Sequence, residues 1–480
     1  MTPFRLLGAT NQMEPNGEVL HLAPWPRDAG ERIGRWLATS RFGFTLLAAL
    51  VGFAAGVGAI AFRWMIFGFT WLATGSYQFG QQGRTPGDHL AFLGLGFFIV
   101  APLIGGLLYG PLIERYAPEA RGHGVPEVMY AVVEQKGRIR PRVTIVKALG
   151  SALCIGSGGS IGREGPIVQI GSAFASTVGQ VLKMPENRMM ALVACGAAGG
   201  ISGTFNAPIT GAFFGFELIL RSFVVDAIFP MIVASAVADL ISRAAFGTQP
   251  IFASIPHNLI VVHSTSYLLV IVLGVVCGIV GVAFKNVLYR TEDLFDAIWR
   301  GRPEWARPAV GGVLLGLLLL ALPGLYGVGY PVIEKALNGH TVLWLLVALA
   351  VAKIVATSVT LGIGGSGGIF APSLFAGAMT GTAFGFVAND TFGSAAGHPA
   401  LYGVIAMGAV FGAATRAPFT SIASATEMTG NFHIAAAVML AVGISVGLSK
   451  ALTYGTIYTT KLLRRGVDID RPRTQTVAPS

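Results

Sequence analysis

Apolar segments follow one another almost without pause from Phe42 to about Leu452, and this continuity restricts what the chain can fold into. Charged residues make up only 12% of the 480 residues, against roughly 25% in an ordinary soluble protein. The mean hydropathy is +0.66. Because such a chain needs lipid as the solvent for much of its surface, we predict an all-α polytopic integral membrane protein. Disordered proteins, disulfide scaffolds and conventional cytosolic enzymes are excluded.

Several partner and processing classes are also disfavoured. The segment Met1–Gly30 contains no apolar core of signal-peptide length, so no cleaved leader is expected. The net charge of +10 is concentrated in the tails and a few loops, which is typical of flanks that face anionic lipid rather than nucleic acid. We expect no metal site and no cofactor. Three cysteines lie in apolar runs and are expected to be small buried side chains: Cys154, Cys195 and Cys277.

Many of the apolar segments do not read as simple membrane spans. A simple span needs about 20 apolar residues, and segments such as Ile167–Leu182 and Pro208–Leu220 are shorter. Glycine-rich or proline-containing breaks interrupt most of the others. Irregular backbone at membrane depth is tolerated only where it is packed in protein or lines a polar cavity. We therefore expect short, tilted and broken helices, and the breaks indicate a transport site.

Three blocks of the first half of the chain recur in the same order in the second half. Gly52, Gly56, Ala61, Phe62 and Arg63 match Gly274, Gly278, Ala283, Phe284 and Lys285. Lys147, Gly156, Gly158, Gly159, Ser160, Gly162, Pro166 and Gly171 match Lys353, Gly362, Gly364, Gly365, Ser366, Gly368, Pro372 and Gly377. Ala207, Pro208, Thr210 and Glu217 match Ala417, Pro418, Thr420 and Glu427. The chain is thus predicted to contain two repeats.

The flanking charges predict that the two repeats enter the membrane from opposite sides. Basic residues precede the first apolar run, follow the last one and fill the loop 136–142, whereas no Lys or Arg occurs between Arg243 and Lys285. Both termini are therefore expected to be cytoplasmic. We predict an N-terminal segment 1–41, repeats 42–246 and 267–465, a connection 247–266 and a tail 466–480. In an inverted repeat, the substrate site lies near the midplane, where broken helices meet.

Four breaks share one design, in which glycine or a tight turn precedes a helix-starting proline. They are Gly122-His123-Gly124-Val125-Pro126, Gly162-Arg163-Glu164-Gly165-Pro166, Gly367-Gly368-Ile369-Phe370-Ala371-Pro372 and Asn206-Ala207-Pro208. Proline suits the first helical turn, and glycine permits the tight approach that leaves backbone N–H groups exposed. If these helix starts converge, they form an anion site without any full positive charge. The alternative is that such pairs merely kink membrane helices.

Few ionisable residues lie within the apolar region. Glu164 is the most informative, because its carboxylate can occupy an anion site when ionised and vacate it when protonated. It is therefore a candidate gate and proton carrier, and Glu217 is a candidate for an internal proton path. Arg163, Lys147 and Lys353 are either part of the site or structural counter-ions.

Two competing hypotheses come from other classes of protein. Ser160 and Ser366 lie in G-x-S-x-G patterns, but the strand–turn–helix context and histidine base of a serine hydrolase are absent from their surroundings. We therefore do not expect an enzyme or a catalytic residue. The other hypothesis is an inverted-repeat secondary transporter of a different, organic substrate.

From about residue 40 to 465, the sequence resembles the CLC family of chloride channels and chloride/proton exchangers. The resemblance rests on the breaks at residues 122–126, 162–166, 206–208 and 368–372, and on Ile457-Tyr458. It implies an inverted-repeat fold of roughly 18 helices and a homodimer with one pore in each subunit. It also implies that Glu164 is the external gating glutamate. Four residues are implied to surround the central anion: His123, Ile369, Phe370 and Tyr458.

Two departures from the family pattern affect the expected mechanism. His123 stands where the family usually has serine in the central anion site. Leu218 stands where exchangers usually carry an internal proton-transfer glutamate, directly after Glu217. The resemblance therefore predicts movement of chloride or a similar small anion and leaves channel and proton-coupled exchange open. The short tail Val467–Ser480 has no room for the regulatory nucleotide-binding (CBS) domains of many relatives, which is typical of a prokaryotic protein of the bacterial inner membrane.

Overall fold

The computed structural model describes residues 27–471, apart from 78, 80–86, 257–258 and 262–263. The predicted N-terminal segment is therefore covered only from residue 27 and the predicted tail only to residue 471, so the remainder of both lies outside the described residues. Within the described part, the chain forms 18 α-helices and no β-strand beyond two isolated bridges. The all-α prediction is confirmed.

The helices fall into two series with the same order of long and short elements. The first series comprises α2 (Arg41–Thr74), α3 (Phe97–Tyr116), α4 (Val125–Val133), α5 (Arg142–Gly156), α6 (Glu164–Val181), α7 (Glu186–Phe205), α8 (Pro208–Phe214) and α9 (Val225–Phe246). The second comprises α10 (Ser264–Trp299), α11 (Arg307–Ala321), α12 (Tyr330–Leu337), α13 (Leu343–Gly362), α14 (Phe370–Phe392), α15 (Pro399–Thr415), α16 (Pro418–Thr429) and α17 (Ala435–Leu452). Helices α1 (Arg27–Thr39) and α18 (Thr459–Leu463) flank them.

Short irregular elements join or extend these helices. The π-helical segment Gly215–Leu220 extends α8. Five 3-10 helices complete the described secondary structure: Asp88–Gly96, Pro118–Ala120, Glu304–Ala306, Pro323–Leu325 and Gly393–Ala395. Packing repeats as well, since α6 lies on α7 as α14 lies on α15, and α2 lies on α9 as α10 lies on α17.

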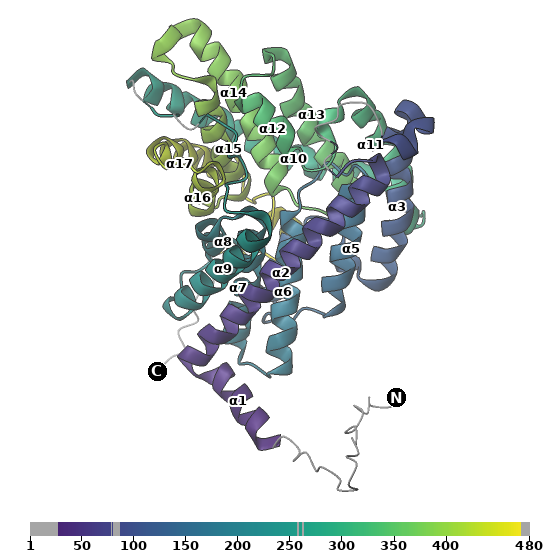
Figure 1. The fold of residues 1–480 in the computed structure, drawn as a ribbon, viewed down its shortest axis with the longest axis vertical. Helices are drawn as coiled ribbons and strands as arrows, with labels where there is room; N and C mark the ends of the chain where they lie inside the picture. Colours follow the sequence, from purple (N-terminus) through teal and green to yellow (C-terminus); the bar gives the residue numbers. More distant parts are fainter. Residues whose placement is uncertain (1–26, 78, 80–86, 257–258, 262–263, 472–480) are drawn as a thin grey trace, which may run out of the picture.

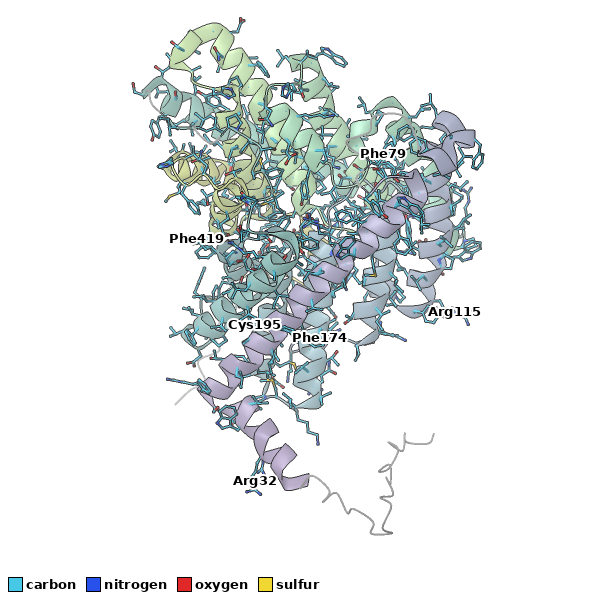
Figure 2. All side chains as sticks on the ribbon, in the orientation of Figure 1. Arg32, Phe79, Arg115, Phe174, Cys195 and Phe419 are labelled. Carbon is cyan, nitrogen blue, oxygen red and sulfur yellow. The ribbon has the colours of Figure 1, made fainter. Side chains whose placement is uncertain are left out.

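The surface and the interior have the distribution expected of an integral membrane protein. Eight of the described helical segments are long and apolar enough to span a bilayer. Large apolar side chains project from the outer helices, and Phe419, which is 51% exposed, lies at one edge of the molecule (Figure 2). Every residue of α15 except Pro399 is buried, and the short helices α8 and α16 lie against each other. The three cysteines are buried and free, as predicted.

Figure 1 shows how the two series are arranged around the centre of the molecule. The long helix α2 crosses the front obliquely, with α5 and α6 below it and α12 to α14 gathered above. Since α2 also contacts α5, α6, α7 and α9, it holds the first series together. The loops that precede α4, α6 and α14 meet between the two series.

Two carboxylates tie the series together reciprocally. The Glu217 carboxylate accepts hydrogen bonds at the start of α16, and the Glu427 carboxylate does the same at the start of α8. The donors are the Phe419 N–H (2.9 Å), the Thr420 N–H (2.6 Å) and the Thr420 hydroxyl (2.6 Å) for Glu217, and the Ile209 N–H (2.9 Å), the Thr210 N–H (2.6 Å) and the Thr210 hydroxyl (2.6 Å) for Glu427. A negative charge is favourable at a helix N-terminus. Because each half makes the same contact with the other, a local two-fold axis relates the halves, as an inverted repeat requires.

The reciprocal caps predict a loss of stability on substitution. Glu427→Ala leaves two backbone N–H groups and the Thr210 hydroxyl without their acceptor, at a cost of about 1–3 kcal/mol. We expect a lower midpoint of thermal unfolding in detergent. Glu114→Ala, at an exposed carboxylate near the end of α3, is the control and is expected to change the midpoint little. Equal midpoints for the two variants would contradict this role of Glu427.

Candidate functional site

The starts of α4, α6 and α14 meet at one point. Gly162 and Gly368 exchange two backbone hydrogen bonds, at 2.7 and 2.6 Å, in an antiparallel bridge. The Gly122 N–H donates to the Gly365 carbonyl at 3.0 Å, and the Gly367 N–H donates to the Gly122 carbonyl at 3.3 Å. Since Gly162 and Gly368 are counterparts in the two repeats, their pairing lies on the local two-fold axis. The structure thus brings together three of the four proline-containing breaks.

Only glycine fits the closest approaches at this junction. Gly124 has φ +84°, and a Cβ there would lie 2.6 Å from the Gly165 carbonyl oxygen. A Cβ on Gly165 would overlap the His123 carbonyl oxygen and lie 3.0 Å from the Gly368 Cα. The three prolines Pro126, Pro166 and Pro372 all lie in the first turn of their helices, where the missing N–H costs no intrahelical hydrogen bond.

The fourth break, Asn206-Ala207-Pro208, does not join the junction, so three of the four helix starts converge. The first N–H groups of α8 are bound by the Glu427 carboxylate. The Asn206 side-chain amide donates to the Gly247 carbonyl at 3.0 Å. This helix start therefore serves the contact between the halves, and the donors that the sequence suggested for an anion are already used.

The Glu164 carboxylate lies inside the junction. Its Oε1 atom accepts a hydrogen bond from the Tyr330 hydroxyl at 3.0 Å. Its Oε2 atom is buried, has no hydrogen-bond partner among the described residues, and lies beside Gly162 and Gly368. A Cβ on Gly368 would lie 3.1 Å from this atom. The carboxylate therefore lies where the helix starts of both halves meet.

Tyr330 is a site residue that the sequence analysis missed. It begins α12 within the break Gly327-Val328-Gly329-Tyr330-Pro331, which has the same G-x-G-x-P spacing as residues 122–126. The signal was therefore present as a fifth break in the corresponding position of the second repeat. What the spacing could not show is that the tyrosine hydroxyl reaches Glu164, which lies 166 positions away in the chain.

The buried cations of the region are used to hold the backbone. The Lys147 ammonium donates to the Ala120 and Gly122 carbonyls at 2.8 and 2.9 Å, and the Lys353 ammonium donates to the Gly327 carbonyl at 2.8 Å. Each lysine thus fixes the glycine break of its own repeat. The Arg163 guanidinium donates to the Thr204 carbonyl at 3.1 Å. These contacts favour the structural interpretation of all three cations.

A cavity of about 390 Å³ reaches the Tyr330 side of the junction. Polar side chains around it include Arg63, Arg163, Thr204, Asn206, Tyr330 and Glu334. Since Tyr330 both lines the cavity and binds Glu164, its side chain lies between the cavity and the buried carboxylate.

The four residues implied to surround an anion are all buried near the junction. Ile369 is the residue before α14 and Phe370 is its first residue, and their N–H groups have no carbonyl one turn earlier in the helix. Tyr458 immediately precedes α18 and lies within electrostatic range of Glu164. Its segment is held by the Tyr289 hydroxyl, which donates to the Ile457 carbonyl at 2.6 Å. Hydrogen-bond donors without fixed charge therefore surround this part of the junction.

The two G-x-S-x-G serines have structural surroundings. The Ser366 hydroxyl donates to the Ala120 carbonyl at 2.6 Å and pairs with the Ser151 hydroxyl at 2.8 Å. The Ser160 hydroxyl is buried and has no hydrogen-bond partner among the described residues. Neither serine hydroxyl is therefore hydrogen-bonded to a histidine base among the described residues, which does not favour the serine-enzyme hypothesis.

Comparison with known proteins agrees with this geometry. A family model described as voltage gated chloride channel matches residues 105–450. A ClcB-like chloride channel protein from Ralstonia nicotianae is 33% identical, covering 88% of this chain and 97% of the relative. An H(+)/Cl(-) exchange transporter ClcA from Vibrio campbellii is 31% identical, covering 95% and 96%. The crystal structure of a slow cyanobacterial Cl-/H+ antiporter matches with a TM-score of 0.77 at 26% identity, covering 89% and 98%.

The close packing of the junction predicts a strong effect of a single methyl group. Gly165→Ala forces the His123 carbonyl away and is expected to destabilise the protein by about 1–3 kcal/mol. Gly443→Ala, in α17, meets nothing within 4 Å and is the matched control. It is expected to be neutral or slightly stabilising, because alanine favours a helix over glycine. Thermal unfolding in detergent compares the two, and an unaffected Gly165→Ala variant would contradict the packing described here.

Proposed function

The chain belongs to the voltage gated chloride channel family, and from that premise we propose that it exchanges chloride for protons across the membrane. It is an integral membrane protein that transports a small inorganic anion. The exchange transporter from Vibrio campbellii matches 95% of this chain, including the region that holds the junction, which supports the proposal. The single observation that carries the proposal is the Glu164 carboxylate, which lies between the paired helix starts of the two halves.

The anion is bound by dipoles and neutral donors in this proposal. The first N–H groups of α14, at Ile369 and Phe370, supply the positive end of a helix dipole. The Tyr458 hydroxyl and a His123 ring nitrogen add donors of the same kind. Because Lys147 and Lys353 are already bound to carbonyls, neither of these buried cations holds the anion so tightly that it cannot leave.

Glu164 is the gate and the proton carrier in this proposal. Ionised, its carboxylate competes with the anion for the junction; protonated, it loses the charge that favours this position. The Tyr330 hydroxyl stabilises the occupied position through its hydrogen bond. A proton thus binds Glu164 when an anion replaces it, which couples the two movements.

A passive channel is the second candidate function, and Leu218 is the observation that favours it. This side chain is apolar and buried, where exchangers of the family usually carry a glutamate. Glu217 beside it binds the start of α16 with both carboxylate oxygens. A proton path through Glu217 stays a prediction, but these hydrogen bonds occupy the group that would carry it.

The remaining assignments follow from charge and resemblance. We assign the side that carries α18 to the cytoplasm, because Lys461, Arg464 and Arg465 lie there and positive residues favour that side. The cavity beside Tyr330 then opens to the outside. Both termini are proposed to be cytoplasmic, and the membrane to be the bacterial inner membrane. A homodimer with one pore in each subunit, and the repeat boundaries 42–246 and 267–465, complete the proposal.

Uphill proton movement tests the proposed exchange. The purified protein is reconstituted in chloride-loaded liposomes, and chloride and proton fluxes are followed with a silver chloride electrode and a pH electrode. We expect an outward chloride gradient to drive protons inward against their own gradient. Glu164→Gln is expected to abolish this proton movement while chloride continues to pass, because the amide cannot carry a proton. Chloride flux without proton movement in the unsubstituted protein would favour the channel. Uptake of an organic anion that chloride does not inhibit would favour a secondary transporter of an organic substrate.

The hydrogen bond from Tyr330 predicts faster chloride movement when it is removed. Tyr330→Phe withdraws a donor from the Glu164 carboxylate, a hydrogen bond worth roughly 1.5 kcal/mol, so chloride flux is expected to rise by about tenfold. Tyr402→Phe is the matched control. It also removes a buried tyrosine hydrogen bond, which runs from α15 to the Ala396 carbonyl in the turn that precedes this helix. A flux that stays unchanged in the Tyr330 variant would show that this hydroxyl does not hold the gate.

A further inference from the structure

His123 brings a titratable ring to the junction, and neither ring nitrogen makes a hydrogen bond within the described residues. The side chain is fully buried, and neither Nδ1 nor Nε2 has a hydrogen-bond partner among the described residues. An imidazole accepts a proton on one nitrogen and releases one from the other. A buried imidazole without hydrogen bonds is costly, unless a solute or proton that passes through the site binds to it.

Glu292 of α10 faces this ring from the α18 side. Its Oε1 atom lies 3.7 Å from His123 Nε2, and its side chain is 18% exposed. Tyr289, three residues earlier on the same helix, packs its ring against the imidazole with centroids 6.3 Å apart. The Glu292 carboxylate therefore lies between the surface on the proposed cytoplasmic side and a buried imidazole.

His123 also borders the segment that carries Glu164. Its carbonyl oxygen lies against Gly165, where a Cβ would overlap it. The order across the junction is thus Glu292, His123 and then the Glu164 segment. His123 thus faces Glu292 with its ring and contacts the Glu164 segment with its main chain.

The charged groups around His123 come from three further helices. Lys147 of α5 and Lys461 of α18 are the cations that act on the ring, and Glu292 is the anion. A Cβ on Gly122 would lie 2.6 Å from the Lys461 ammonium. Glu127 of α4 is bound by Arg465, and this hydrogen bond raises the pKa of the Arg465 guanidinium, so the pair stays ionised. Two cations, one anion and the Glu127–Arg465 pair therefore surround the ring.

We propose that Glu292 and His123 form the cytoplasmic half of the proton path, in place of the carboxylate that Leu218 lacks; this rests on the proposed exchange function. A proton from the cytoplasm binds the Glu292 carboxylate, passes to His123 Nε2, and leaves from Nδ1 towards Glu164. Glu292 is then a carboxylate again and the imidazole is neutral. The ring proton now lies on Nε2 instead of Nδ1, and it must return to Nδ1 before the next transfer. Nothing is oxidised or reduced, and no covalent bond other than N–H and O–H changes.

Neighbouring carboxylates on α10 provide a matched test. In the liposome assay, Glu292→Gln is expected to lower chloride-driven proton flux by about tenfold or more. A proton-transferring side chain typically contributes a factor of about 100 or more, so a tenfold loss is a conservative threshold. Chloride flux is expected to persist. Asp293→Asn is the control, because Asp293 binds Arg464 at 2.7 and 2.9 Å instead of facing His123. It is expected to keep the proton-to-chloride ratio of the unsubstituted protein.

Two further variants keep the proposal falsifiable. Glu292→Asp retains an ionisable group and is expected to restore part of the proton flux, which a folding defect would not do. His123→Asn keeps a hydrogen-bond donor but cannot relay a proton, and is expected to lower proton flux as well.

The outcomes separate this proposal from the function on which it rests. If Glu292→Gln keeps the normal proton-to-chloride ratio while Glu164→Gln abolishes it, protons enter elsewhere and this path is overturned, although exchange stands. If the unsubstituted protein moves chloride without protons, exchange itself fails and the path falls with it.

Discussion

The backbone pairing of Gly162 with Gly368 is the contact on which the rest of the site depends. Two repeat counterparts can exchange hydrogen bonds with each other only on the axis that relates their halves. At that position, α6 from one half and α14 from the other must begin almost in contact. A side chain on Gly124 or Gly165 would separate the backbones, so the approach depends on glycine at these positions. The pairing thereby turns two ordinary helix starts into one surface of converging N–H groups.

The carboxylates of the region divide into two kinds according to their partners. Glu217 and Glu427 each accept three hydrogen bonds from the opposite half and so act as fixed caps. Glu164 accepts one from Tyr330 and leaves its second oxygen unpartnered at the junction. A group held by many donors is costly to move, whereas one held by a single hydroxyl can exchange with a solute. The proposed gate is therefore held by fewer hydrogen bonds than either of the two caps.

The basic side chains show a similar division. Lys147 and Lys353 are buried, but their ammonium groups are used to fix the glycine breaks of the two repeats. Their contribution to the junction is to hold the backbone in position, and the N–H groups at the start of α14 then provide the local attraction for an anion. A site built in this way attracts an anion and still permits its release. The proposed role of His123 and Glu292 adds a titratable pair on the proposed cytoplasmic side.

The sequence alone determined the membrane class, the two repeats and the glycine–proline breaks, because each depends on composition or on spacing along the chain. Spacing also contained the fifth break at Tyr330, although that residue was recognised only in the structure. Tertiary structure decided which breaks converge: α4, α6 and α14 meet, whereas the start of α8 is capped by Glu427 from the other half. It also decided that Glu292 rather than Asp293 faces His123. These outcomes depend on contacts between residues that are often more than 150 positions apart in the chain, and local spacing carries no information about such contacts.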